Sequence, residues 1–272
     1  MNIQNGITGK LQLNATTIKI IAIALMAIDH IHQMFSWAGV SVALKWFGRP
    51  VFPLLLFIMA ESFYHTRDRK KFLFRLLVGA WFMVILNAVL QALLPNHDVV
   101  LMNSAFMTFF VAGLYMLFWD MLVAGVKARS AKKITAAILL CFVPVLTGLP
   151  ALLIVQLANH WSLPFPVLRL LINACLLLPS VFTQEAGLIM AVGILFYITR
   201  TRRWAQIAVL AAFSVFYFAV GNDAAHQWLM VFAAIPMLLY NGEKGHGLKY
   251  FFYIFYPAHI YLLYIIATLV RG

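Results

Sequence analysis

Five ionisable side chains lie within or at the edge of apolar segments, and their types and positions could support chemistry. They are Asp29, His30, Arg49, Glu61 and His259. Hydrocarbon penalises each of these groups when it is charged, so an ionisable residue in a membrane segment asks for a functional or structural reason. Histidine is the side chain best suited to exchange a proton near neutral pH. The set therefore indicates the reactive centre of a membrane-embedded enzyme.

Asp29 and His30 form the most distinctive polar pair, yet one helix directs them differently. Adjacent helical residues point about 100° apart, whereas Asp29 and His32, at i and i+3, share a side and could pair. His30 is expected to meet another helix, acting as general base or transient acyl carrier, while Asp29 orients an imidazole. The alternative for Asp29 is a structural salt bridge with Arg49 or another buried cation.

The remaining three candidates each allow two interpretations. Arg49 could bind an anionic group or an oxyanion, or it could be an interfacial anchor. Glu61 could relay protons, or it could join a helix end to the basic residues that follow it. His259 follows Pro257, so it could stabilise an oxyanion, or it could be a core histidine bonded to a carbonyl that the proline frees.

A basic cluster follows the second apolar segment and invites a comparison with phosphate-binding sites. Its members are Arg67, Arg69, Lys70, Lys71 and Arg75. These side chains could hold the phosphates of a nucleotide-like cofactor. They also match a plain topology signal, because positive charge concentrates in cytoplasmic loops.

The composition indicates the class of protein that must position these residues. The chain is 64% hydrophobic and 10% charged, against about 25% charged in a soluble domain. We therefore expect an all-α, polytopic integral membrane protein. The net charge of +12 is explained by basic clusters between spans, so no nucleic-acid partner is expected. Cys141 and Cys175 have no metal-ligand spacing, and no metal site is expected.

The apolar runs and the basic loops predict a topology of nine transmembrane helices in one integral membrane domain, 1–272. A polar N-terminus (1–16) lies in the cytoplasm and the C-terminus lies outside. Lys132 and Arg202 both belong in the cytoplasm, so one of the three apolar segments between them does not cross. We expect that segment to be 165–182, re-entrant or interfacial. The predicted spans are about 17–37, 50–64, 72–94, 100–123, 134–157, 186–199, 204–220, 226–240 and 250–269.

Several motifs together resemble the TraX family of bacterial membrane proteins. They are Ile28-Asp29-His30-Ile31, Phe47-Gly48-Arg49-Pro50-Val51-Phe52-Pro53, Glu61-Ser62-Phe63-Tyr64-His65-Thr66-Arg67, Tyr240-Asn241-Gly242-Glu243-Lys244-Gly245 and Phe252-Tyr253-Ile254-Phe255-Tyr256-Pro257-Ala258-His259. The resemblance covers about 17–78 and 195–265. His32 departs from the pattern, since a small residue, commonly glycine, is expected there.

The resemblance implies an acyltransferase of the bacterial cytoplasmic (inner) membrane. Acetyl-CoA would be the donor, docking at the cytoplasmic basic cluster. The acceptor would be a pilin-like protein N-terminus, or a hydroxyl or amine of a glycan or small molecule. The lipid bilayer is the surrounding partner, and a homodimer stays open. Two other functions compete with this hypothesis: a proton-coupled transporter using Asp29, His30, Glu61 and His259 as a relay, and a non-catalytic assembly factor.

Overall fold

The computed structural model describes residues 12–161, 164–182 and 187–271. In that part of the chain every regular element is a helix, and the only β-type pairing is an isolated bridge between Leu13 and Tyr240. The predicted all-α membrane class is confirmed. Seven helices are long and apolar enough to cross a bilayer: Ala15–Ala38, Ala43–His65, Arg69–Leu93, Ala105–Lys127, Ala131–Ala158, Arg203–Val220 and Tyr250–Arg271.

Three shorter apolar helices, Pro166–Leu176, Leu188–Ile198 and His226–Leu239, account for the other predicted membrane segments. The helix within the predicted re-entrant segment is α8 (Phe165–Leu176), 12 residues long. The predicted span 186–199 is α9 (Gly187–Ile198), also of 12 residues. A helix of that length rises about 18 Å, well short of a ~30 Å hydrocarbon core. Nine crossings therefore stays a prediction.

The contacts within the chain group into two compact units. Unit 1 comprises 1–61, 97–99 and 199–272, and unit 2 comprises 62–96 and 100–198. Helix α3 (Val51–His65) begins in unit 1 and ends in unit 2. The single integral membrane domain stays a prediction, and the units are described one at a time.

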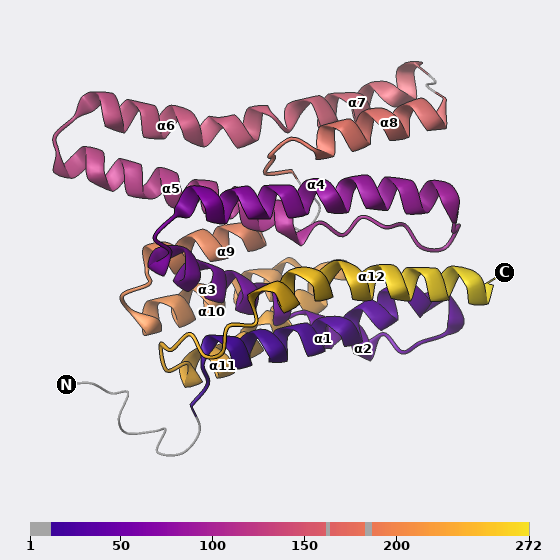
Figure 1. The fold of residues 1–272 in the computed structure, drawn as a ribbon, viewed down its shortest axis with the longest axis horizontal. Helices are drawn as coiled ribbons and strands as arrows, with labels where there is room; N and C mark the ends of the chain where they lie inside the picture. The colour runs from indigo at the N-terminus through magenta and orange to yellow at the C-terminus, as the bar shows by residue number, and fades with distance from the viewer. Residues whose placement is uncertain (1–11, 162–163, 183–186, 272) are drawn as a thin grey trace. The chain divides into compact units, whose positions relative to one another are not determined.

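Unit 1 joins the two ends of the chain. It contains α1 (Ala15–Phe35), the 3-10 turn η2 (Ser36–Ala38), α2 (Ala43–Gly48), most of α3, α10 (Arg203–Val220), η3 (Asn222–Ala233), α11 (Ala234–Leu239) and α12 (Lys249–Arg271). Helices α1 and α12 run side by side (Figure 1). The Asn14 side chain caps α1 by accepting from the Thr17 backbone N–H at 2.9 Å, as expected for a polar N-cap.

The start of α1 is also bonded to the segment that precedes α12. Leu13 donates its backbone N–H to the Leu239 carbonyl at 2.9 Å and accepts from Asn241 at 2.9 Å. The Thr16 hydroxyl lies 3.0 Å from the Lys244 carbonyl oxygen and 2.6 Å from that of His246. These bonds hold the first long helix against the last connecting segment and set the register of α1 against α12.

Unit 2 is a set of helices built on α4 (Arg69–Leu93) and α5 (Ala105–Lys127), which pack together. Helices α6 (Ala131–Leu146) and α9 pack on α5, and α7 (Leu149–Trp161) packs on α8. The predicted span 134–157 is interrupted between α6 and α7, in a stretch containing Pro144, Gly148 and Pro150. Proline and glycine account for the break, because the first removes a helical donor and the second favours no single conformation.

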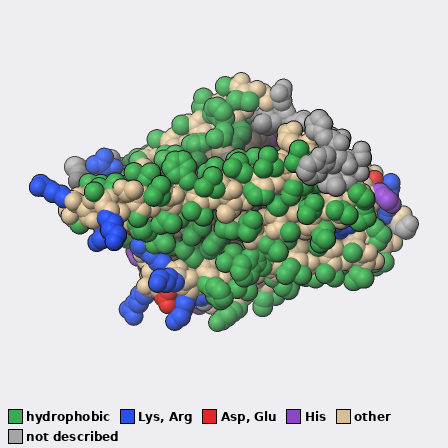
Figure 2. Space-filling view, turned by 90° about the horizontal axis from the view of Figure 1, so that it is seen from above, with side chains coloured by type: hydrophobic (Ala, Val, Ile, Leu, Met, Phe, Trp, Pro, Cys, Tyr) green, Lys and Arg blue, Asp and Glu red, His purple; other side chains and the backbone are tan. Residues whose placement is uncertain are grey.

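Large apolar side chains cover the outside of many helices. Phe74 is 60% exposed on α4, Leu139 is 63% exposed on α6 and Val215 is 67% exposed on α10. The face in Figure 2 is mostly hydrophobic, with the Lys and Arg side chains gathered toward its edge. Soluble monomers rarely present such extensive apolar surface, so this surface fits a multi-pass membrane protein.

Candidate functional site

All five candidate catalytic residues, Asp29, His30, Arg49, Glu61 and His259, belong to unit 1. The structure brings two of them into direct contact. Nδ1 of His30 on α1 lies 2.8 Å from Nε2 of His259 on α12. Their rings stack with centroids 5.0 Å apart and planes 12° apart. The side chains are buried, with exposures of 6% and 8%, so the first and last long helices form a histidine pair shielded from solvent.

The hydrogen bonds of His259 determine where the protons of the pair lie. Nδ1 of His259 is 2.7 Å from the Phe255 carbonyl oxygen. A carbonyl only accepts, so this Nδ1 carries a proton, and in the neutral ring Nε2 is then an acceptor. His30 must therefore donate from Nδ1 to His259, which leaves the lone pair of neutral His30 on Nε2. In the neutral histidine pair, the acceptor nitrogen of His30 is therefore Nε2.

Phe255 also stacks on His259, with ring centroids 4.8 Å apart. The carbonyl that Pro257 frees by lacking an N–H is that of Tyr253, four residues earlier. His259 bonds to the Phe255 carbonyl instead. Its interpretation as a histidine that only satisfies the freed carbonyl therefore does not match the contacts observed.

Asp29 points away from the histidine pair and lies against the end of α2. A Cβ added to Gly48 would overlap the Asp29 side chain, so the two helices meet where glycine leaves room. Asp29 interacts electrostatically with Arg49, Lys45 and His32. Within the described ranges it forms no direct salt bridge. The divergence expected of adjacent helical residues is observed.

His32 does not form the bond with Asp29 that the i, i+3 spacing allowed. Its Nδ1 lies 3.2 Å from the Val40 carbonyl oxygen, because the η2 turn carries the chain back past the end of α1. Arg49 donates from Nη1 to the Gln227 side-chain oxygen of η3 at 2.9 Å. Its buried Nε has no hydrogen-bond partner among the residues that the structure describes.

Glu61 lies in a separate cluster at the start of α10. Its carboxylate is 3.8 Å from Nη1 of Arg203, and the two side chains are 15% and 19% exposed. Arg203 also donates to Gln206 at 2.8 Å and lies over the rings of Phe57 and Tyr240, at 4.4 and 5.2 Å from their centroids. The structure therefore assigns Glu61 a partner on α10, whereas the sequence suggested the basic residues that follow α3.

The basic cluster of unit 2 is divided between internal and exposed residues. Nη1 of Arg69 is 2.5 Å from the Asp120 carboxylate, and the Tyr197 hydroxyl donates to that carboxylate at 2.6 Å. Arg69 also lies over the Phe63 ring, 5.0 Å from its centroid. This arginine holds α4, α5 and α9 together, so it is not available to bind a phosphate.

The other basic residues remain on the surface of unit 2. Arg67, Lys70 and Lys71 are exposed and Arg75 is partly exposed. Asp68 caps α4 by accepting from the Lys71 backbone N–H at 3.0 Å. That hydrogen bond lowers the pKa of the Asp68 carboxyl below its usual value.

Comparison with known proteins identifies the family. The model of the TraX protein family matches residues 14–267. The chain belongs to the TraX family. The resemblance noted in the sequence motifs is thus confirmed, and the match extends through the middle of the chain, where the sequence shows little beyond hydropathy.

A relative of this TraX-family chain is a protein of Dichelobacter nodosus named "Probable fimbrial assembly protein FimC, serogroup H1". The two are 29% identical over 265 residues, which cover 93% of this chain and 95% of the relative. No solved structure matches the chain. The similarity to this relative, whose name refers to fimbrial assembly, extends over nearly the full length of both proteins.

Sequence reasoning about this TraX-family protein missed three polar contributors. Asp120 lies inside an apolar run, so the rule that singled out Asp29 would have found it. Arg203 adjoins Arg202, which was interpreted only as a topology signal, and Gln227 carries no charge that would single it out. Among the described residues, no group of three or more His, Cys, Asp or Glu is arranged to hold a metal ion.

Proposed function

We propose that this TraX-family protein is a membrane-embedded acyltransferase, which moves an acetyl group from cytoplasmic acetyl-CoA to an amino or hydroxyl acceptor. The observation that supports the proposal most directly is the buried histidine pair, in which His30 and His259 are 2.8 Å apart. An intramembrane histidine with its tautomer fixed by a second group is suited to act as a general base.

The positions of the protons on the two histidines are consistent with the following course of reaction. Nε2 of His30 removes the proton of the acceptor N–H or O–H as the acceptor attacks the thioester carbonyl carbon. The resulting positive charge can pass to His259, because His30 already donates to it from Nδ1. Collapse of the tetrahedral intermediate breaks the C–S bond, and the departing thiolate takes up the proton. If His30 is instead the acyl carrier, the same nitrogen attacks the thioester first.

Charge stabilisation in this proposal comes from the pair itself. The imidazolium that forms lies in a buried environment, where it attracts the oxyanion of the intermediate more strongly than it would in water. The Phe255 carbonyl, 2.7 Å from Nδ1 of His259, stabilises the same positive charge. Asp29 and Arg49 interact with each other at the end of α2 and take no direct part in this course.

Basic residues on the surface of unit 2 would bind the acetyl-CoA donor, and the named relative suggests a class of acceptor. Arg67, Lys70, Lys71 and Arg75 would contact the phosphates of acetyl-CoA in the cytoplasm, whereas Arg69 serves the structure of unit 2. The relative named for fimbrial assembly favours a pilin-like N-terminal amine as acceptor, with a glycan or small-molecule hydroxyl or amine as the other class. The protein would reside in the bacterial inner membrane, with its N-terminus inside and its C-terminus outside.

The test is acetyl transfer by the purified protein in detergent. Radiolabelled acetyl-CoA is incubated with wild type, His30→Ala and a matched control, His97→Ala, which removes an exposed histidine. Loss of a general base typically costs about 10²–10⁴-fold in rate. We expect His30→Ala to lose donor turnover by at least 10²-fold and His97→Ala to retain it. Label that remains on the wild-type protein after rapid denaturation at neutral pH and disappears in His30→Ala would support an acyl-carrier role for His30.

Full turnover in a folded His30→Ala protein would refute the proposed role of His30. A wild-type protein that neither hydrolyses acetyl-CoA nor transfers its acetyl group would refute acyl transfer. The name of the relative would then favour the second candidate, a non-catalytic fimbrial assembly factor.

A further inference from the structure

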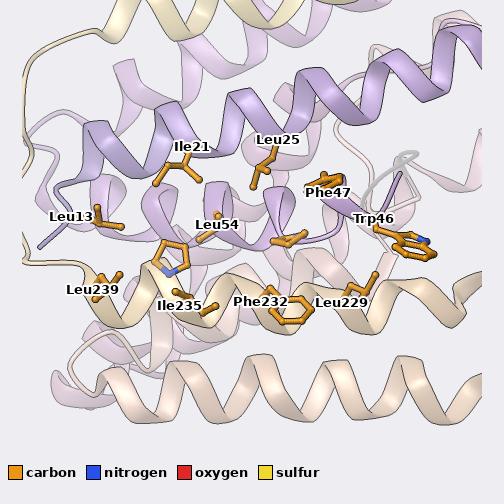
Figure 3. A pocket seen from close by; sticks show the side chains of 12 residues that line it. Leu13, Ile21, Leu25, Trp46, Phe47, Leu54, Leu229, Phe232, Ile235 and Leu239 are labelled. Carbon is orange, nitrogen blue, oxygen red and sulfur yellow. The ribbon is translucent and has the colours of Figure 1, made fainter. Parts of the chain in front are cut away.

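Unit 1 contains an elongated groove with a wholly apolar lining. The groove has a volume of about 600 Å³ and lies between α1, the α2–α3 junction and the η3–α11 segment. Its walls include Ile21 and Leu25 of α1 on one side and Phe232 and Ile235 on the other (Figure 3). The twelve lining residues are Leu13, Ile21, Leu25, Trp46, Phe47, Pro50, Leu54, Leu229, Phe232, Ile235, Pro236 and Leu239.

The groove is open along its length. Phe47, Phe232 and Ile235 are 48%, 50% and 57% exposed although they line it. An exposed apolar groove in water would be a liability, whereas in a membrane protein it is a surface for hydrocarbon. Its lining contains no polar side chain that would select a polar ligand.

The dimensions of the groove favour a single hydrocarbon chain. The wall from Leu229 to Leu239 is about 17 Å long, from ~2.0 Å per residue in the 3-10 part and ~1.5 Å in α11. That length is close to one leaflet of a hydrocarbon core, about 15 Å.

Positive charge lies at the α2 end of the groove. Trp46 and Phe47 line that end, and the flanking Lys45 is exposed while Arg49 is partly buried. The Arg49 Nε has no partner among the described residues. Trp46 stacks on His226 with centroids 5.4 Å apart, and tryptophan is typical of the membrane interface. Lys45 and Arg49 carry two formal positive charges and Asp29, which interacts with both, carries one negative charge, so the formal charge at this end favours an anionic headgroup.

We propose that this groove binds one acyl chain of an anionic phospholipid, with the phosphate of its headgroup at Lys45 and Arg49. The apolar lining supplies affinity for the chain and the two cations select the headgroup. The stripe of Ile21 and Leu25 on α1 continues at the same spacing to Asp29, so a bound lipid lies along the face that ends at the charged cluster. The site is separate from acyl transfer, and its occupancy requires no acetyl-CoA.

The test uses photoreactive lipids in phosphatidylcholine vesicles containing the full-length protein. Phosphatidylglycerol and phosphatidylethanolamine, each with a diazirine on one acyl chain, are cross-linked, and the adducts are mapped by mass spectrometry. We expect phosphatidylglycerol adducts concentrated on lining residues of α1, η3 and α11. The double variant Lys45→Gln/Arg49→Gln loses the charge-assisted contacts to the phosphate. It should therefore reduce the phosphatidylglycerol adducts about tenfold, to the number of adducts that phosphatidylethanolamine forms.

Two substitutions on α11 provide a matched comparison. Ile235→Trp fills the groove, whereas Leu238→Trp adds the same bulk at an exposed position (43%) outside it. The first should lower groove adducts about tenfold and the second should leave them unchanged. Leu25→Trp fills the groove from the opposite wall and replaces Ile235→Trp if that variant does not fold.

Three results would overturn the proposal. If the adducts were spread evenly over lining residues and exposed positions such as Val215, the groove would not be a specific lipid site. If both lipids labelled the groove equally, the proposal that Lys45 and Arg49 select an anionic headgroup would be refuted. Unchanged labelling in both groove-filling variants would show that the chain lies elsewhere.

Discussion

Replacing Gly48 by alanine sets two opposing effects against each other. Gly48 ends α2 with ordinary helical geometry. Glycine in a helix is about 0.5–1 kcal/mol less favourable than alanine, so helix propensity alone predicts a more stable protein. The added Cβ, however, would come within 2.7 Å of the Asp29 Cβ and closer still to its carboxylate. Rotating the carboxylate relieves only part of this overlap, because the Asp29 Cβ is fixed to the α1 backbone.

The overlap outweighs the propensity gain. Overpacking at a helix contact costs about 1–3 kcal/mol, so we expect Gly48→Ala to lower the free energy of unfolding by about 1–2 kcal/mol. The assay is equilibrium unfolding in mixed micelles of dodecyl maltoside and sodium dodecyl sulfate, followed by circular dichroism. Gly79→Ala on α4 is the control, since its nearest neighbour is the Phe106 ring at 3.1 Å, a milder overlap than the one at Gly48; it should change stability little.

A double-mutant cycle tests whether the overlap with Asp29 causes the destabilisation by Gly48→Ala. Asp29→Ala removes the carboxylate, so Gly48→Ala should cost about 1 kcal/mol less in that background. Stabilisation of the wild-type background by Gly48→Ala would refute the close packing of α1 on α2. Costs that agree within about 0.5 kcal/mol in both backgrounds would refute the contribution of the carboxylate.

Three further outcomes are expected in the same assay or by hydrogen exchange. Glu61→Gln should destabilise unit 1 by about 1–3 kcal/mol, because Arg203 loses its anionic partner. Asp120→Asn should cost a similar amount in unit 2, about 1–3 kcal/mol, and unfolding that equals wild type would contradict the role of its ion pair. The Asp68 cap has a lowered pKa, so its contribution is complete above the usual value of 3.8 and is lost as pH falls through the lower folded value. The protection factor of the capped Lys71 amide, which is its exchange rate relative to the intrinsic rate at the same pH, should therefore fall in acid, and Asp68→Asn should abolish that dependence.

The helical class was predictable because apolar runs separated by basic clusters are a property of local sequence. The short helices were harder to predict, since α8 and α9 are apolar like the seven long helices and differ from them in length. Hydropathy does not reveal where a helix ends within an apolar stretch. Proline and glycine do, as the break between α6 and α7 demonstrates.

The sequence predicted which residues belong to the candidate site, but it did not predict which of them contact one another. His30 and His259 were both singled out as intramembrane histidines, yet their contact joins residues 229 positions apart, and no local spacing encodes such a contact. Local rules did predict that Asp29 and His30 diverge, because helix geometry alone requires it. The Asp29–His32 bond was not formed because the η2 turn offered His32 a backbone carbonyl, which side-chain spacing could not anticipate.

The histidine pair also limits when the site can form during biosynthesis. At about 5–20 residues per second, the 229 residues that follow His30 up to and including His259 take roughly 10–45 s to synthesise. During that interval α1 is in or at the membrane without α12, and His30 lacks the partner that it donates to in the finished protein. Most of unit 2 is contiguous in the chain and is made while unit 1 is still incomplete. The buried contact between α1 and α12 can therefore form only after the last long helix has been made.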